Sequence, residues 1–473
     1  MIFASRTLWD RIFQFAKQNW VPLTCGIILE LGFAVFLQLT NAPNWTSLPG
    51  LFFVLFSIYL FTIWLAKKRI PHSSRGLLII VIFAVAFRLT LLFSGPVFSF
   101  DIYRYIWDGK VAANGINPFM YPPEADELAG LRDSNWLLIN HKYLKTGYPP
   151  LMELLFEFLY IAFRSVFSYK VTFFLFDLGT IVVLLLLLKE LKLDVRNLIV
   201  YAWAPLPVVE ISQTGHNDSV VVFFVVLAFL LMARGRNISS AAVMSLAVIS
   251  KIYPIFFVPV LFKRWGRCGT LLFFVITLVS HIPYIGVGWS IYESLLFVFN
   301  TTNFNGSIFP VITNIIDWAR ITSNPGLVAQ FIVYGTYASL LAWTFVKSRS
   351  SQLGTPQLME ISFLLTGTLL LVNRSFFSWY MIWMIPFLVF YMFRSWLLLS
   401  GTTFLGYLKY DSFPPPDHEA VSPQMGQIID VVQYLPFYAI FAYELAKKWY
   451  TRFPKKRSST SMRISAKMAS EVQ

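Results

Sequence analysis

Residues 76–93 read GLLIIVIFAVAFRLTLLF, and residues 94–110 continue SGPVFSFDIYRYIWDGK. A helix of about 17 to 21 apolar residues crosses roughly 30 Å of hydrocarbon, so the first segment predicts a membrane span. The second segment carries two aspartates and an arginine directly after it. Asp101 is therefore expected just past the end of a membrane helix.

The same apolar pattern recurs along the chain of 473 residues, of which 57% are hydrophobic and 13% charged. The mean hydropathy is +0.63, which excludes a string of soluble domains and indicates an integral membrane protein. We expect an all-α polytopic fold with about twelve full transmembrane helices. They are predicted at 20–40, 49–66, 76–93, 171–188, 197–214, 218–233, 269–288, 327–346, 357–373, 377–393, 395–409 and 428–446.

Two segments leave the topology open: 149–167, which begins with Pro149-Pro150, and 238–262, which is interrupted by Lys251-Ile-Tyr-Pro254. If 149–167 is an outer juxtamembrane helix and 238–262 is a pair of half-helices entering from the cytoplasm, every strong basic cluster is cytoplasmic. If both are full spans, two basic clusters move outside. The first arrangement is favoured; it places outside Asn44, His141, His216, Asn305 and His418, and inside Lys68, Arg236, Arg264 and Lys455.

Composition also limits the classes of function. The net charge of +14 would suggest nucleic-acid binding in a soluble domain, but in a membrane protein it mostly reports cytoplasmic loops, so no nucleic-acid partner is expected. Cys25 and Cys268 are too few for a disulfide framework or a zinc site. The sequence has no phosphate-cradling glycine loop, no HExxH and no GxSxG motif, which disfavours a nucleotide-using enzyme.

The polar segment after the third span offers a candidate base. Asp101 lies at i, i+3, i+4 and i+7 spacing with Arg104, Tyr105 and Asp108, so the four side chains could share one helix face. A carboxylate there could act as a general base. A surface helix with an internal Asp/Arg ion pair fits the same spacing equally well.

Three further positions are candidates. In Gly215-His216-Asn217-Asp218 an oxygen side chain could simply cap the next helix, or His216 and Asp218 could reach the cavity of Asp101 and hold a divalent ion or a sugar hydroxyl. Lys251 lies inside an apolar segment, where an ammonium is costly without an anionic partner, so it is a functional candidate. Arg374 lies at the outer end of a span, where snorkelling to headgroups is an alternative.

The order of these motifs resembles that of the polytopic GT-C glycosyltransferases that use polyprenyl-phosphate sugars. The first loop carries Asp101, Trp107-Asp-Gly, Gly115-Ile-Asn-Pro-Phe119, Ile139-Asn-His141 and Tyr148-Pro-Pro-Leu151. Gly215-His-Asn-Asp218, Ser250-Lys-Ile-Tyr-Pro254 and Asn373-Arg-Ser-Phe-Phe-Ser-Trp-Tyr380 are similar to motifs of prokaryotic polyprenol-phosphate mannosyltransferases and of the catalytic subunit of GPI mannosyltransferase I.

The resemblance implies an inverting transferase that moves a hexose, most plausibly mannose, from a polyprenyl phosphate to a hydroxyl of a lipid-linked or extracytoplasmic glycan. Asp101 would be the catalytic base. Binding of the donor phosphate would fall to Lys251, Arg374 and Arg104, and binding of the sugar or acceptor to His141, His216, Asp218, Asp108 and Tyr148. A transporter or flippase of lipid-linked sugars is the alternative, although it would not need the long aromatic and acidic first loop.

No cofactor is expected to be required. Eukaryotic members of the superfamily carry Asp-x-Asp where this chain has Ser99 and Asp101, so the first acidic residue is absent; a Mg²⁺ or Mn²⁺ ion held by Asp101 and Asp218 stays the alternative. Membrane lipids, the lipid-linked donor and a glycan acceptor are the expected partners. The expected site is the outer face of a prokaryotic plasma membrane, with the lumenal face of an ER membrane as the other possibility.

The predicted domain organisation has four parts. Residues 1–75 form two accessory transmembrane helices, 76–326 the GT-C catalytic module, 327–446 variable C-terminal transmembrane helices, and 447–473 a basic cytoplasmic tail, expected to be disordered. The catalytic module contains the outer catalytic loop 94–170 with juxtamembrane helices, the second outer turn 215–218, the half-helix pair 238–262 and the outer loop 289–326.

Overall fold

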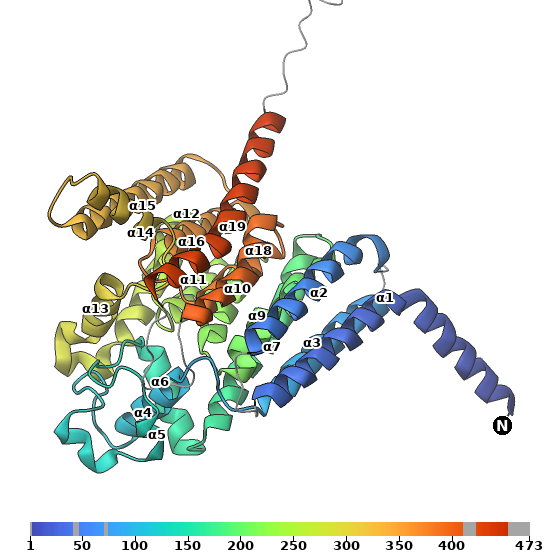
Figure 1. Cartoon of the computed structure of the whole chain (residues 1–473), viewed down its shortest axis with the longest axis horizontal. Coiled ribbons are helices and arrows are strands. Elements are labelled where there is room, and N and C mark those ends of the chain that lie inside the picture. Colours follow the sequence, from blue (N-terminus) through green and yellow to red (C-terminus); the bar gives the residue numbers. More distant parts are fainter. Residues whose placement is uncertain (1, 41–46, 71–73, 410–421, 453–473) are drawn as a thin grey trace, which may run out of the picture.

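The computed structural model describes residues 2–40, 47–70, 74–409 and 422–452, and helices dominate these ranges (Figure 1). No strand occurs within them, where extended pairing is limited to isolated bridges of Phe304 and Asn305 with Ser375. Eight of the described helices are long and apolar enough to cross a membrane. The prediction of an all-α polytopic membrane protein is confirmed. Asn44, His418 and Lys455 lie outside the described residues.

The N-terminal helices pack as a group at one side of the bundle (Figure 1). They are α1 (Ile2–Thr40), α2 (Leu48–Arg69) and α3 (Ser74–Leu92), and α1 contacts both of the others. Helix α1 changes direction at Asn19, whose φ of −119° is not helical, and its first part points away from the bundle. The apolar stretch 76–93 therefore forms a helix, as expected, and ends shortly before Asp101.

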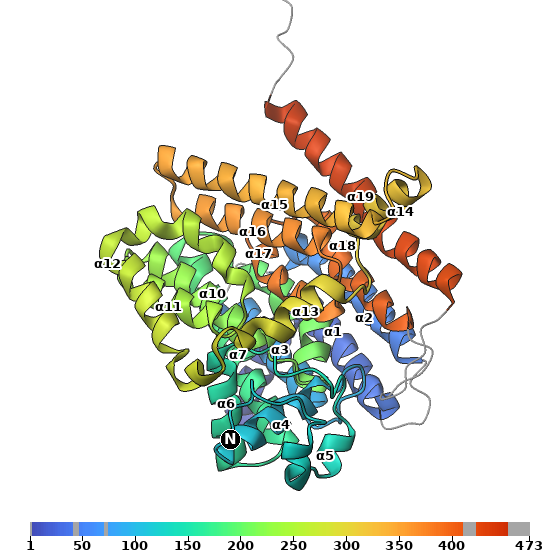
Figure 2. The ribbon, with the colours of Figure 1, turned by 90° about the vertical axis from the view of Figure 1, so that its left-hand side faces the viewer.

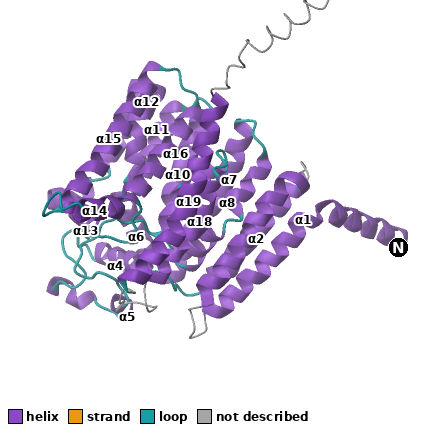
Figure 3. Cartoon of the chain, turned by 45° about the horizontal axis from the view of Figure 1, so that its top comes forward, coloured by secondary structure: helices purple, strands orange, loops and turns teal. Residues whose placement is uncertain are grey.

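The long first loop contains several short helices at one end of the bundle, where Figure 3 shows most of the loops. These are α4 (Asp101–Ala113), η2 (Asp126–Leu131), α5 (Ser134–Leu137) and α6 (Pro150–Ala162). Helix α4 packs on α6 so closely that Gly109 has no room for a Cβ against the backbone carbonyl of Phe156. With 13 residues, α6 is about 20 Å long, too short for a full span, which favours the juxtamembrane assignment.

Several spans predicted as continuous are broken, so the prediction of about twelve full helices is wrong in detail. Residues 197–214 divide into η3 (Val195–Leu198), α8 (Ile199–Ala202), α9 (Pro205–Pro207) and the π-helical turn η4 (Val208–Gln213). Residues 377–393 contain only η7 (Ser378–Trp383) and α17 (Ile385–Leu388), and 395–409 divide into α18 (Arg394–Thr402) and η8 (Thr403–Lys409). Pro205, Pro207 and Pro386 lack the N–H that a continuous helix requires.

The middle of the chain forms a packed group of helices. Helix α7 (Val166–Glu190) packs on α10 (Asp218–Ala233), which packs on α11 (Asn237–Val248). The chain then breaks near Lys251 and continues through η5 (Tyr253–Phe257) into α12 (Val258–Val279). Gly266, with φ 68° and ψ −175°, interrupts α12. The segment 238–262 is thus two short arms joined at Lys251, the arrangement expected of a half-helix pair.

Helices of the last part of the chain pack on the middle group, where α15 contacts α12 and α16 contacts α10. It comprises η6 (Ile282–Tyr292), α13 (Glu293–Thr301), α14 (Ile308–Trp318), α15 (Pro325–Ser350), α16 (Thr355–Val372) and α19 (Pro423–Arg452). The predicted span 269–288 does not form one helix, because α12 ends at Val279 and the 3₁₀ helix η6 begins with Ile282-Pro283. Figure 2 shows α15 and α16 side by side, with α13 crossing above the first loop.

Candidate active site

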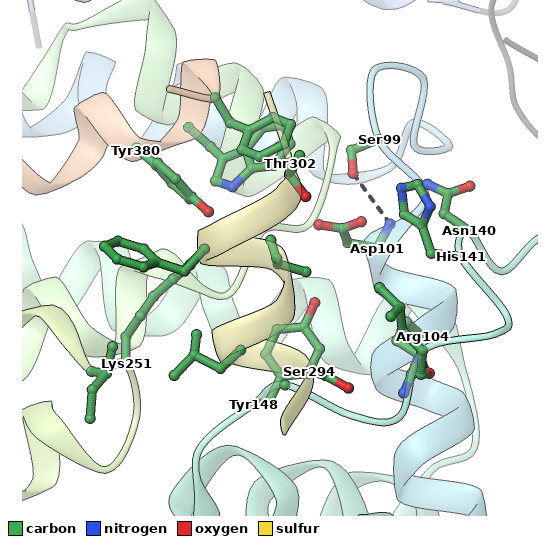
Figure 4. A pocket seen from close by; sticks show the side chains of 18 of the residues that line it. Ser99, Asp101, Arg104, Asn140, His141, Tyr148, Lys251, Ser294, Thr302 and Tyr380 are labelled. Carbon is green, nitrogen blue, oxygen red and sulfur yellow. Dashed lines mark hydrogen bonds between the residues drawn. The ribbon is translucent and has the colours of Figure 1, made fainter. Parts of the chain in front are cut away.

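A cavity of about 940 Å³ lies where the first loop meets the broken helices (Figure 4). Most of its lining comes from five segments that are far apart in the sequence: residues 98–105, 139–149, 250–256, 294–304 and 377–383, to which Leu369 and Tyr407 add. The lining includes Asp101, Arg104, His141, Tyr148 and Lys251. The structure therefore brings five of the nine predicted site residues to one cavity.

Asp101 is the first residue of α4, and its side chain points into the cavity (Figure 4). That side chain is 30% exposed, and its backbone N–H donates to the Ser99 hydroxyl at 3.3 Å. The N-terminus of a helix favours a negative charge at this position. Among the described residues that line the cavity, Asp101 is the one carboxylate, so it is the group placed to accept a proton from a bound hydroxyl.

Lys251 enters the cavity from the break between α11 and η5. Its ammonium donates to Asp218 Oδ1 at 2.6 Å and lies over the rings of Tyr380 and Trp383, 5.5 and 5.3 Å from their centroids. Trp383 Nε1 donates to the same Asp218 oxygen at 2.6 Å. Lys251 is 21% exposed and Asp218 only 1%. The intramembrane cation thus has an anionic partner and still presents a positive charge to the cavity.

The structure does not bring Asp218 to the cavity surface, and its binding of sugar stays a prediction. Asp218 does not line the cavity, because it is buried beneath Lys251 and Trp383. It does not cap α10 either: Asn217 is the N-cap residue and makes no side-chain capping bond. Gly215, with φ +83°, makes the tight turn that leads into this segment.

Arg104 and Asp108 form a buried pair one helical turn apart on α4. Arg104 Nε donates to both Asp108 oxygens at 2.8 and 3.0 Å, and its Nη1 donates to the Leu144 carbonyl at 2.9 Å. Asp108 does not line the cavity, so the structure does not bring it together with the other predicted residues, and its sugar contact stays a prediction. Arg104 does line it, but its guanidinium is bound to Asp108 and does not orient Asp101.

A second acid lies below this pair. Thr146 donates its hydroxyl proton to Glu153 Oε1 at 2.6 Å, and Glu153 is fully buried. Burial, with the nearby Asp108 charge, raises the pKa of Glu153 well above its ordinary value, and burial likewise raises the pKa of Asp108 against the opposing effect of Arg104. The first loop therefore packs on a buried carboxyl group whose pKa is raised well above its ordinary value.

His216 lies behind Asp101 and outside the cavity lining, and its contact with sugar stays a prediction. It is 1% exposed, does not line the cavity and stacks on Trp379 with ring centroids 4.3 Å apart. Its Nε2 is 3.8 Å from Asp101 Oδ2, and its Nδ1 is 3.0 Å from Glu210 Oε2. Glu210 was missed by the sequence analysis, although a carboxylate inside the apolar run Val208–Ile211 is a signal that could have found it.

The remaining predicted residues fall into two groups. His141, with φ 49°, and Tyr148 line the cavity from the first loop, and Tyr148 packs edge-on against Tyr105. Arg374 does not line it: its guanidinium donates to Asn303 Oδ1 at 3.0 Å and to the Asn300 carbonyl. The predicted role of Arg374 in phosphate binding is therefore not supported, because its donors hold the loop after α13.

Both cationic and apolar side chains line the cavity. Lys142 and Lys145 line it from the first loop, and Lys145 Nζ lies 3.0 Å from Glu293 Oε2 at the start of α13. Residues 295–299 of α13, together with Phe256 and Leu369, add apolar surface. A lining of this composition suits a ligand with an anionic head and a hydrocarbon tail.

A divalent ion does not fit the two predicted ligands. Asp218 Oδ1 already accepts from an ammonium and an indole N–H, so a metal ion there would face the Lys251 charge at hydrogen-bond distance. Nor does any group of three His, Cys, Asp or Glu side chains suited to a metal occur among the described residues. Lys251 instead supplies positive charge at this side of the cavity.

Comparison with known families gives one match. The model described as "Alpha-(1->6)-mannopyranosyltransferase, N-terminal domain" matches residues 26–267, just over half of the chain. That range contains Asp101, Glu210, His216, Asp218 and Lys251, but not α13 or the aromatic segment 377–383. No curated protein and no solved structure matches the chain.

Proposed function

Because the chain belongs to the alpha-(1→6)-mannopyranosyltransferase family, it is a glycosyltransferase of the mannosyl-transfer type in a membrane, and we propose that its donor is a polyprenyl-phosphate mannose. The observation that carries this proposal is the composition of the cavity lining. It combines the carboxylate of Asp101 and several basic side chains with the apolar residues 295–299 of α13. An isoprenoid would lie along α13 while its phosphate reaches the cations.

The proposed acceptor is a hydroxyl of a lipid-linked or extracytoplasmic glycan, and the family description suggests the primary 6-hydroxyl of a mannose residue. Its oxygen attacks the anomeric carbon, the bond from that carbon to the phosphate oxygen breaks, and the hydroxyl proton passes to Asp101. The polyprenyl phosphate leaves with the bonding electrons. Lys251 is placed to stabilise the negative charge on it.

We propose inversion at the anomeric carbon. A retaining double displacement uses a second carboxylate as nucleophile close to the first. Asp101 has no such companion in the described part of the cavity lining. Since a single displacement inverts, an α-linked product requires a β-linked mannosyl phosphate as donor. That the cavity opens on the outer face of the membrane remains a prediction.

The test uses the whole protein in nanodiscs with radiolabelled polyprenyl-phosphate β-mannose and a soluble α-1,6-linked mannoside acceptor. Asp101→Asn should fold and bind the donor but lose turnover by at least about a hundredfold, because the amide cannot accept the proton. The matched control is Asp126→Asn, an exposed aspartate of η2, which should keep the parent rate. Near-normal turnover by Asp101→Asn would place the base elsewhere.

The same assay separates transfer from transport. A flippase of lipid-linked sugars would move the donor across a bilayer without forming a glycosidic bond. The family match favours transfer, so labelled mannoside product should appear in nanodiscs, which have no enclosed compartment.

A further inference from the structure

A chain of mostly buried polar groups leads from Asp101 through His216 and Glu210 to Tyr407, which itself also lines the cavity. Behind Asp101 comes His216, then Glu210, and the Glu210 carboxylate accepts the Tyr407 hydroxyl at 2.9 and 3.0 Å. Glu210 is fully buried, and the backbone N–H of His216 donates to the Glu210 carbonyl at 2.9 Å. Two separate bonds between these two residues therefore fix the orientation of the imidazole.

The contact with Glu210 bears on which imidazole nitrogen carries the hydrogen. A carboxylate only accepts hydrogen bonds, so Glu210 as a carboxylate pairs with Nδ1–H of His216, and in the neutral ring Nε2 then carries a lone pair. Nε2 is buried and has no hydrogen-bond partner within the described residues. It faces Asp101 Oδ2 at 3.8 Å. An ionised Asp101 also offers only lone pairs, so no hydrogen bond joins them before reaction.

We propose that His216, oriented by Glu210, is a positioning residue that accepts a hydrogen bond from Asp101 only after Asp101 has taken the acceptor proton. The proton leaves the acceptor oxygen as that oxygen bonds to the anomeric carbon, and it comes to lie between Asp101 Oδ2 and His216 Nε2. It returns to water when the product leaves. This inference rests on the proposed function, because it requires Asp101 to be the base.

The arrangement stabilises the transition state more than the ground state. Before reaction, Asp101 Oδ2 and His216 Nε2 face each other with lone pairs only. When the proton arrives on Asp101 the two atoms form a hydrogen bond, and the distance between them shortens by about 1 Å to ordinary hydrogen-bond length. Stacking of Trp379 on the imidazole keeps water from the ring. An interaction formed only in the transition state changes kcat and leaves substrate binding unaltered.

Two variants test the proposal. His216→Phe keeps an aromatic ring against Trp379 but has no nitrogen. In Glu210→Gln the Tyr407 hydroxyl should donate to the amide oxygen, so the amide N–H is left facing Nδ1 of His216. Nδ1 must then accept, and the ring hydrogen moves to Nε2. In this tautomer Nε2–H donates to the ionised Asp101 and can no longer accept its proton. Each variant should lower kcat at least about tenfold, with KM for the donor within about twofold of the parent. The double variant should be no slower than the slower single variant, because both remove one function.

Glu30→Gln is the matched control, since Glu30 on α1 also accepts a hydrogen bond from a hydroxyl, that of Thr90, and does not line the cavity. Its kcat should equal that of the parent. If neither His216→Phe nor Glu210→Gln folds, His216→Gln replaces them in the test, because it changes the side-chain volume little. It too should lower kcat without raising the KM for the donor.

The outcomes separate the two proposals. If Asp101→Asn is inactive while folded His216 or Glu210 variants keep the parent kcat, the hydrogen-bond proposal is overturned and the transferase proposal stands. A rise in donor KM that accounts for the whole loss also overturns it, because that result indicates a structural role. If Asp101→Asn keeps its turnover, both proposals fail together.

Discussion

Replacing Lys251 should have two consequences that can be measured separately. Its ammonium is the charged partner of Asp218, which is 1% exposed, so Lys251→Met leaves a buried carboxylate whose remaining donor is the Trp383 indole. Breaking a buried pair from one side typically costs about 3–5 kcal/mol. The same change removes the cation proposed to bind the donor phosphate. Both stability and turnover should therefore fall.

The double variant Lys251→Met/Asp218→Asn separates these effects. With no buried charge left, most of the lost free energy of unfolding should return, whereas donor turnover should stay low because the phosphate still lacks its cation. Lys448→Met is the control, since Lys448 and Glu360 are 3.0 Å apart but each is 47% exposed. That surface pair should be worth less than about 1 kcal/mol.

Thermal unfolding in nanodiscs and initial rates at varied donor concentration provide the two readouts. A double variant with the parent turnover would refute the assignment of Lys251 to the donor phosphate. A Lys251→Met variant no less stable than Lys448→Met would refute the structural part of the reasoning.

Arg374→Ala should keep turnover within a few-fold of the parent, because Arg374 lies outside the cavity lining. A hundredfold loss in the initial-rate assay would instead indicate that Arg374 binds the donor phosphate. Burial raises the pKa of Glu153, so its contribution to stability is complete below the ordinary glutamate pKa and is lost as the pH rises through the raised value. Glu153→Gln should therefore flatten the fall in stability above the ordinary glutamate pKa, which thermal unfolding at several pH values can follow. In a Cys268→Ser background, an impermeant thiol reagent should label Asp126→Cys from outside but not Arg236→Cys, and the reverse would invert the topology.

The sequence predicted the features that depend on local pattern. Apolar length predicted α3 and α7, and the Lys251-Ile-Tyr-Pro254 motif predicted the break between α11 and η5. The same reasoning failed at 197–214 and 377–393, where it predicted continuous helices. A mean hydropathy does not register that each proline removes a backbone N–H donor and breaks the helix. In a protein interior the freed carbonyls find other partners, such as Arg88, which donates to the Ala202 carbonyl at 2.7 Å.

Partners within the site could not be predicted from the sequence, because they depend on packing between distant segments. Asp218 meets Lys251 after 33 residues and Trp383 after 165, and Glu210 meets Tyr407 after 197. Spacing on α4 did suggest an Asp/Arg pair, but the helix selects Asp108 as the partner of Arg104 and leaves Asp101 free to face the cavity.

Asp101 and Lys251 carry opposite charges at one cavity, and nothing in their own chemistry keeps them from pairing with each other. Asp218 does so, because it accepts a hydrogen bond from the ammonium and holds Lys251 on its own side. Once the substrates exclude water, every charge in the cavity interacts more strongly, so a pair formed across it would block both the base and the phosphate site. Asp218→Asn releases Lys251 from its partner. We therefore expect folded Asp218→Asn protein to have a lower turnover than the parent, beyond any loss caused by unfolding. The reason is that the released ammonium would pair with Asp101 and keep it from accepting a proton.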